Sequence, residues 1–88
     1  MAQFFIESTH TPEECARGLD DLSHHPDTLS KFSFGCLHGN HTAWGLVDAT
    51  SESAARNLVP SVVRSKARVV QVDKFTPEQI KELLKAHA

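Results

Sequence analysis

The stretch from Lys31 to Asp48, KFSFGCLHGNHTAWGLVD, constrains the fold more than any other part of the chain. It is typical of two strands joined by a tight turn at Gly39-Asn40, with glycine first as a type II′ hairpin turn prefers. A two-residue loop fixes four pairs: His38 with His41, Cys36 with Ala43, Gly35 with Trp44, and Phe34 with Gly45. Each strand glycine then lies opposite a large aromatic ring, which fills the space of the missing side chain.

Two capping boxes mark helix starts. In Thr11-Pro12-Glu13-Glu14, threonine is the N-cap, proline takes the first helical position and glutamate the third. Apolar residues at helical spacing extend this helix to about Leu22. Thr76-Pro77-Glu78-Gln79 repeats the signal before a short C-terminal helix. A further helix begins near Glu52 and ends or kinks at Pro60.

The remaining apolar segments, Gln3–Ser8 and Ala67–Val72, are predicted strands. The order β-α-β-β-α-β, followed by a short helix, predicts an α+β protein. Its sheet has four antiparallel strands in the order 4-1-3-2, with two helices on one face. A chain of 88 residues is long enough for one small core, so residues 1–88 are expected to form a single domain.

In element order and length the chain resembles the ferredoxin-like fold. It resembles in particular the small bacterial proteins known as dimeric α+β barrels, and the stretches GCLHGNHTAWGLVDA and ARVVQVDKFTPEQI are similar to those of an uncharacterised family in that group. The resemblance covers nearly all 88 residues. Members of this superfamily include isomerases, cofactor-free oxygenases, haem-degrading enzymes and small metal-binding proteins. The resemblance therefore implies a fold and leaves the function open.

Strand alternation sorts the side chains into two faces. The more apolar set is assigned to the helix side: Phe4, Ile6, Ser8, His10, Phe32, Phe34, Cys36, His38, His41, Ala43, Gly45, Val47, Val70 and Val72. The other face mixes charges, including Gln71 and Asp73 of the last strand, with large apolar groups that a monomer usually covers. We therefore expect a homodimer through this face, formed by Phe5, Glu7, Leu37, Trp44 and Leu46.

The predicted topology brings the end of the first strand, the start of the first helix and the hairpin turn to one edge. Five candidate metal ligands meet there: His10, Cys15, Cys36, His38 and His41. Imidazole and thiolate groups suit zinc, copper or nickel. The helix dipole is expected to favour the Cys15 thiolate, and the two cysteines are expected to be thiols rather than a disulfide. Buried packing of the cysteines and solvation of the histidines is the alternative.

The favoured function is a small metal-binding or metal-handling protein, with no catalytic residue assigned. One alternative is a dimeric α+β-barrel enzyme acting on a small molecule, of isomerase or cofactor-free oxygenase type. His10 or His38 would then act as general base, because imidazole titrates near neutral pH. The other alternative is a non-catalytic ligand-sensing or assembly module.

Charge and hydropathy exclude several classes of partner. Nine basic and eleven acidic residues are mixed along the chain without a basic stripe, which argues against nucleic acid. No segment approaches the ~20 apolar residues of a membrane span. The N-terminal MAQFFIES lacks the basic and apolar regions of a signal peptide. A cytoplasmic protein is the expectation.

Overall fold

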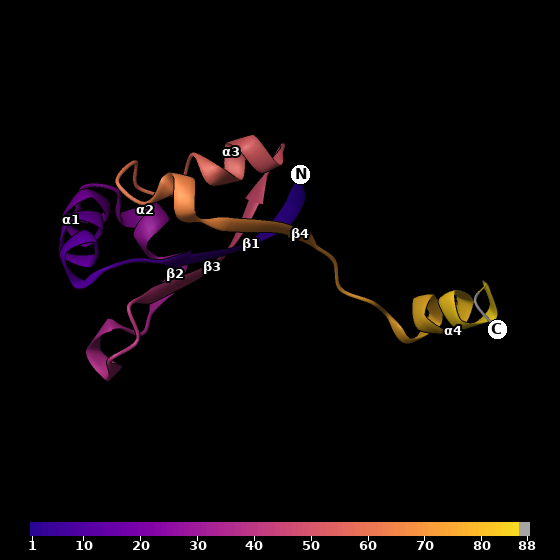
Figure 1. Cartoon of the computed structure of the whole chain (residues 1–88). Helices are drawn as coiled ribbons and strands as arrows, with labels where there is room; N and C mark the ends of the chain where they lie inside the picture. The colour runs from indigo at the N-terminus through magenta and orange to yellow at the C-terminus, as the bar shows by residue number, and fades with distance from the viewer. Residues whose placement is uncertain (87–88) are drawn as a thin grey trace.

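A four-stranded antiparallel sheet forms the centre of the molecule, and helices cover one of its faces (Figure 1). The structure is a computed structural model that describes residues 1–86. The strands, β1 (Ala2–Thr9), β2 (Phe32–Phe34), β3 (Thr42–Ala49) and β4 (Arg68–Val72), lie in the order β2-β3-β1-β4. This is 4-1-3-2 read from the other edge, so the α+β class and the strand order predicted from the sequence are confirmed.

The helices begin where capping signals stand in the sequence. α1 (Pro12–Ser23) and α4 (Pro77–Ala86) each start at a proline that follows a threonine. α3 (Glu52–Arg56) is capped by the Ser51 hydroxyl and ends well before Pro60. The sequence did not predict α2 (Pro26–Leu29) or two 3₁₀ segments, η1 (Cys36–His38) and η2 (Arg64–Lys66). Within residues 1–86, no helix combines the length and apolar character needed to cross a membrane.

The core lies between the sheet and its helix-covered face. Ile6, Val47 and Val59 are essentially fully buried, and burial of one such side chain contributes roughly 1.5–3 kcal/mol. The strands supply one half of the core and the segment from α3 to β4 supplies the other: Phe4, Ile6, Phe32, Ala43, Val47 and Ala49 face Ala55, Val59, Val63 and Ala67. This face matches the helix-side set predicted for β1, β2 and β3.

The predicted hairpin register between β2 and β3 is wrong. Phe34 pairs with Ala43 instead of Gly45, a slip of two residues, and β2 ends there. The chain forms η1 instead of continuing as a strand, because the Gly35 carbonyl accepts from the amides of His38 and Asn40. Gly39 closes this turn at φ 84°, a left-handed conformation that glycine adopts without steric cost. An even slip leaves each β2 side chain on its predicted face.

Close packing against the Phe32 ring requires a glycine at position 45. It pairs with Phe32, and a Cβ at Gly45 would lie 2.7 Å from two atoms of the Phe32 ring. The aromatic ring thus occupies the space of the missing side chain, as predicted for this glycine, although the ring is that of Phe32 and not Phe34.

The predicted faces of β4 are reversed. Val70 pairs with Phe5 and Val72 with Gln3, so both valines share the face opposite the helices, whereas Gln71 pairs with Phe4. The segment ARVVQV carries valines at both parities, so alternation alone could not fix its orientation. Val69 instead packs against the core. We call the side without helices the open face.

Three exposed apolar side chains line up across the open face. Val70, Phe5 and Leu46 are paired in one row over β4, β1 and β3, and they are 38%, 38% and 44% exposed. Trp44 lies in the next row and donates its indole N–H to Glu7 at 3.2 Å. Leu37 lies on η1 and not on a strand, and its side chain is 95% exposed. Its predicted position in the sheet is therefore wrong.

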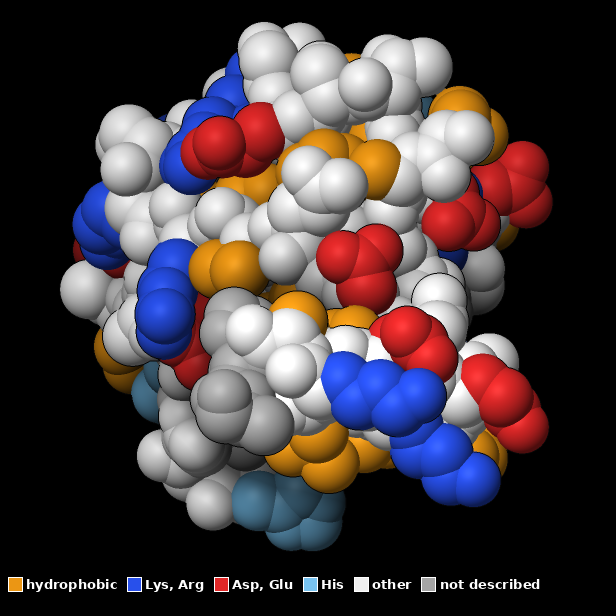
Figure 2. All heavy atoms as spheres, turned by 90° about the vertical axis from the view of Figure 1, so that its right-hand side faces the viewer, with side chains coloured by type: hydrophobic (Ala, Val, Ile, Leu, Met, Phe, Trp, Pro, Cys, Tyr) orange, Lys and Arg blue, Asp and Glu red, His pale blue; other side chains and the backbone are white. Residues whose placement is uncertain are grey.

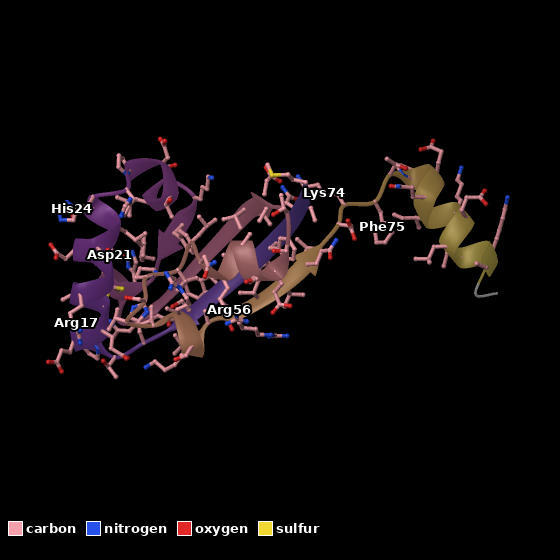
Figure 3. The ribbon with its side chains drawn as sticks, turned by 90° about the horizontal axis from the view of Figure 1, so that it is seen from above. Arg17, Asp21, His24, Arg56, Lys74 and Phe75 are labelled. Carbon is pink, nitrogen blue, oxygen red and sulfur yellow. The ribbon has the colours of Figure 1, made fainter. Side chains whose placement is uncertain are left out.

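α4 stands apart from the rest of the chain. The segment 73–76 carries it beyond the end of β4 (Figure 1), and the molecule measures 49 × 28 × 21 Å as a result. None of its residues is buried, and Ile80, Leu83 and Leu84 are 45%, 44% and 64% exposed. Viewed from this end, apolar side chains reach the surface between charged ones (Figure 2). Lys74 and Phe75 lie on the connecting segment (Figure 3).

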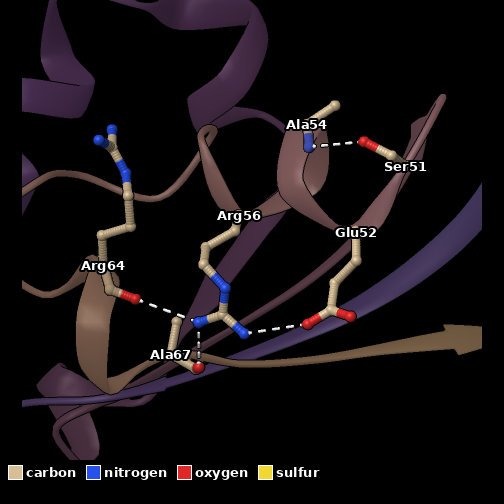
Figure 4. A network of polar contacts seen from close by, with 6 residues as sticks. All are labelled: Ser51, Glu52, Ala54, Arg56, Arg64 and Ala67. Carbon is tan, nitrogen blue, oxygen red and sulfur yellow. Dashed lines mark hydrogen bonds and ion pairs between the residues drawn. The ribbon is translucent and has the colours of Figure 1, made fainter.

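Two arginines near α3 donate hydrogen bonds to backbone carbonyls. The Arg56 guanidinium donates to the carbonyls of Ala67 at 2.7 Å and Arg64 at 3.3 Å, and it pairs with Glu52 (Figure 4). Arg64 donates in turn to the carbonyls of Val59 and Asn57. These bonds satisfy backbone acceptors in a segment without regular secondary structure.

Candidate metal centre

Three chain segments meet at the edge of the sheet where β1 ends. The amide of His10 donates to the His41 carbonyl at 3.0 Å, which extends the pairing of β1 and β3 by one step. Cys15 lies in the first turn of α1, which begins at Pro12, two residues after His10. Cys36 opens η1, directly after β2 and Gly35. The predicted convergence at this edge is therefore present.

Four side chains form the candidate centre, called here the His/Cys cluster: His10, Cys15, Cys36 and His41. One ligand atom from each lies within 4.8 Å of those of the other three. The sulfur atoms of Cys15 and Cys36 are 2.7 Å apart, and Cys36 Sγ is 3.7 Å from His10 Nε2. Both cysteines are free, as predicted. This donor set, two sulfurs and two imidazoles, is the one found in Cys₂His₂ zinc sites.

The backbone orients the ring of His10. Its Nδ1 lies 3.1 Å from the Ser8 carbonyl oxygen. A carbonyl only accepts, so this contact places the proton on Nδ1 and leaves the Nε2 lone pair directed at the cluster. Metal-binding histidines almost always use such a partner to fix the tautomer. His41 Nδ1 is buried without a hydrogen-bond partner among the described residues.

Burial shifts the pKa of two cluster members, Cys15 and His10. Desolvation, with a smaller contribution from the Cys36 sulfur, raises the pKa of Cys15 to about 11. The predicted stabilisation of its thiolate by the helix dipole is outweighed, because a thiolate loses its hydration when buried. Desolvation also lowers the pKa of His10, which favours the neutral imidazole that a metal needs.

His38 is not part of the cluster. It lies at the end of η1 and is exposed, because the chain leaves the strand before Cys36 and alternation no longer applies. The four members show a sequence pattern that would have separated them from His38. His10 and Cys15 enclose four residues, and Cys36 and His41 also enclose four, giving H-x₄-C…C-x₄-H.

A small apolar cavity adjoins the cluster. It lies between α1, the sheet and the segment after α3, where His10, Cys15 and the buried Ser8 hydroxyl face Phe32, Val59 and Val63. The space open to the centre of a water molecule is about 20 Å³. That is room for about one water molecule, whereas organic ligands occupy sites of roughly 300–1,000 Å³.

A salt bridge fixes the start of α1 beside the cluster. The Lys66 ammonium contacts the Glu14 carboxylate, and the same carboxylate accepts from the Thr11 amide at 2.9 Å. The hydrogen bond with Lys66 is the main reason that the pKa of Glu14 falls to about 2. The first turn of α1, in which Cys15 directly follows Glu14, is thereby linked to η2 just before β4.

The chain matches no known family model, and neither a curated protein nor a solved structure is detectably similar to it. Any assignment of function therefore depends on the cluster and its surroundings.

Proposed function

We propose that the protein binds a transition-metal ion, with zinc as the best fit, through His10, Cys15, Cys36 and His41. The observation that carries the proposal is the approach of four ligand atoms to within 4.8 Å of one another, from residues distant in the sequence. The ring of His10 is already held with Nε2 toward the site. We further infer a ferredoxin-like domain as the scaffold, since its element and strand orders agree with that fold.

The geometry requires only small side-chain adjustments to accept zinc. Tetrahedral Zn²⁺ with bonds of about 2.3 Å to sulfur and 2.0–2.1 Å to nitrogen places two sulfurs about 3.8 Å apart and two nitrogens about 3.4 Å apart. The two sulfurs must separate by about 1 Å from 2.7 Å, and the most distant pair of ligand atoms must close by a similar amount from 4.8 Å. Rotation about χ1 supplies such movements without a change in the backbone.

The partial exposure of the cluster favours a site that takes up and releases its metal over a site that only stabilises the fold. Cys15 is buried, whereas His10, Cys36 and His41 are partly exposed. An ion can therefore reach three of the four ligands from solvent. The hydrophobic core between the sheet and its helices includes none of these four side chains. We therefore expect the protein to remain folded without metal, and we expect a bound ion to exchange with ions in solution.

The proposal is tested with protein made without a histidine tag and kept reduced. Mass spectrometry of metals measures the content, and a chromophoric chelator competes for Zn²⁺ to give the affinity. Cobalt substitution reports sulfur ligation through thiolate-to-metal charge-transfer absorption. We expect one metal ion per chain, and a loss of affinity of roughly 100-fold or more in His41→Ala and in Cys36→Ser.

His38→Ala is the matched control. It removes a histidine from the same loop, three residues from His41, and should leave the zinc affinity unchanged. Equal losses in His38→Ala and His41→Ala would show that the loop binds metal in another arrangement. Affinities weaker than about 10 μM for zinc, nickel and copper alike, in reduced protein, would overturn the proposal.

Binding of a small organic molecule is the second candidate. A polar depression of about 390 Å³ lies at the other end of α1, lined in part by Asp21, His25 and Arg64. Its size suits a metabolite, but Arg64 already donates to two backbone carbonyls. Ligand-induced NMR shifts at Asp21 and His25, with none at His10 or His41, would favour this candidate.

A further inference from the structure

The C-terminal helix and the open face of the sheet are two apolar surfaces of one chain, and neither is covered by other residues within 1–86. On α4, Ile80, Leu83 and Leu84 form one stripe, since they fall within about 100° of one another at 100° per residue. On the sheet, Val70, Phe5 and Leu46 form the exposed row described above. Exposed apolar groups gathered in this way mark interaction sites more often than single ones do.

We propose that α4 of one molecule packs on the open face of a second copy, and that the exchange is reciprocal. The proposal is independent of the metal centre. The open face was predicted from the sequence to be the dimer interface, and the proposal assigns α4 of the partner, and not the partner's sheet, as its cover.

The first argument is the instability of α4 by itself. The helix has 10 residues and none of them is buried. Isolated helices shorter than about 12–15 residues are marginal in water, and most helices in proteins owe their stability to packing of an apolar face. The capping box at Thr76 and Gln79 fixes where the helix starts but does not supply that packing. α4 therefore requires a surface to pack on.

The second argument is that the connection leads α4 away from its own sheet. The segment 73–76, Asp-Lys-Phe-Thr, continues the direction of β4 without regular structure (Figures 1 and 3). It contains no glycine, the residue that reverses a chain at positive φ without steric cost. Thr76 precedes Pro77, which biases it toward an extended conformation. Fold-back over the open face of the same molecule is thereby disfavoured.

The third argument is the match of dimensions and symmetry. Three adjacent strands span about 9.6 Å at 4.8 Å spacing, and a ten-residue helix is about 15 Å long, so α4 can cross the whole row. Lys81 borders the apolar stripe and Asp48 borders the row on the open face, which gives one complementary charge pair. Both surfaces are on every chain, so exchange between two copies leaves neither exposed and closes with two-fold symmetry.

Sedimentation equilibrium of the full chain is the primary test, with three variants. Leu83→Ser with Leu84→Ser removes the stripe, and Leu46→Lys places a charge in the row. Each should weaken the dimer by roughly 30-fold or more, because central apolar residues carry most of the binding energy. Glu78→Ser with Lys85→Ser alters the opposite side of α4 and is the matched control, with dimerisation unchanged. Circular dichroism and Trp44 fluorescence verify that each variant is folded.

A mixture of the two defective variants adds a sharper test. In a reciprocal exchange, the helix of Leu46→Lys can still pack on the intact sheet of Leu83→Ser/Leu84→Ser. The mixture should therefore form more dimer than either variant alone. Isotope-filtered NMR on mixed labelled and unlabelled wild-type chains should show contacts from Leu83 and Leu84 methyl groups to the Phe5 ring between different molecules.

Three outcomes would overturn the proposal. The same NMR contacts within one molecule would mean that α4 folds back on its own sheet. A dimer unaffected by the α4 variant but lost in Leu46→Lys would mean direct packing of sheet on sheet. Wild-type protein that stays monomeric at the highest concentrations measured, with α4 unprotected from hydrogen exchange, would leave the open face without an occupant from this chain.

Discussion

α1 and α4 begin with nearly the same sequence and lie in opposite environments. In both, a threonine side chain accepts from the amide three residues on, and a glutamate or glutamine side chain accepts from the threonine amide. α1 buries Cys15, Gly18 and Leu22, whereas α4 buries nothing. The cap therefore decides where a helix starts, and the path of the chain around it decides whether its apolar side is covered.

The largest difference between the two helices should appear on loss of an apolar side chain. Leu22 is 4% exposed, so Leu22→Ala is expected to lower the free energy of unfolding by about 2–5 kcal/mol. Leu83→Ala should change it by less than about 0.5 kcal/mol in dilute, monomeric protein. Urea denaturation followed by Trp44 fluorescence measures both. A large, concentration-independent effect of Leu83→Ala would mean that α4 packs within its own molecule.

Zinc should increase the difference between the two helices, because the proposed metal site lies beside α1 and away from α4. At a free concentration of 100 times the dissociation constant, a ligand specific for the folded state contributes about 2.7 kcal/mol to stability. We expect amide exchange to slow in α1 and η1 on zinc addition, with α4 unchanged. Hydrogen exchange with mass spectrometry makes the comparison directly. Equal protection of α4 would contradict the proposed position of the metal.

Removal of the two caps should separate local from global stability. Thr11→Ala is expected to cost about 1 kcal/mol of unfolding free energy, since α1 unfolds together with the core. Thr76→Ala should reduce helical circular dichroism without moving the Trp44 unfolding midpoint in dilute protein. A shift of that midpoint in Thr76→Ala equal to the shift in Thr11→Ala would show that α4 is part of the cooperative unit.

The smallest expected effect is on acid stability. Glu14 and Gln79 occupy the same position in the two capping boxes, but only the Glu14 side chain can lose or gain a proton. The pKa of Glu14 falls from an ordinary value of 4.5 to about 2 in the folded chain, mainly through Lys66. A carboxylate with a lowered folded-state pKa stabilises the protein above about pH 4.5, and this contribution is lost as pH falls toward 2. Thermal melts of metal-free Glu14→Gln should therefore lose stability less steeply than wild type between pH 5 and 2. An equal fall in melting temperature between pH 5 and 2 in the two proteins would argue against the contact between Glu14 and Lys66 in solution.

Local signals in the sequence predicted much of the fold. The cap residues located the starts of α1 and α4, and alternation placed β1 and β3 correctly because Glu7 and Asp48, the charged residues of these strands, mark one face as the more polar one. Prediction failed where local signals were ambiguous. Valines at both parities concealed the orientation of β4. The sequence also contained no clear signal for α2, because a proline such as Pro26 can end one helix or occupy the first position of another.

The site was predicted more completely than the hairpin that contains part of it. All four members of the His/Cys cluster were among the five candidates, because topology alone brings their segments to one edge. His38 was included because the strand was extended through η1, a step that depended on the assumed turn at Gly39. The carbonyl contacts of Gly35, which form the 3₁₀ turn instead, have no signature in a single sequence.

The contact between Gly45 and Phe32 limits how sequences with this fold can diverge. Any side chain at position 45 would displace a ring that belongs to the core. A smaller residue at position 32 would in turn leave a space that only a larger residue at position 45 could fill. The two positions are thus expected to change together, thirteen residues apart on neighbouring strands. Distant kin of this chain should be recognisable by an aromatic–glycine couple at that spacing, combined with the mirrored H-x₄-C and C-x₄-H pairs, even where overall identity has decayed.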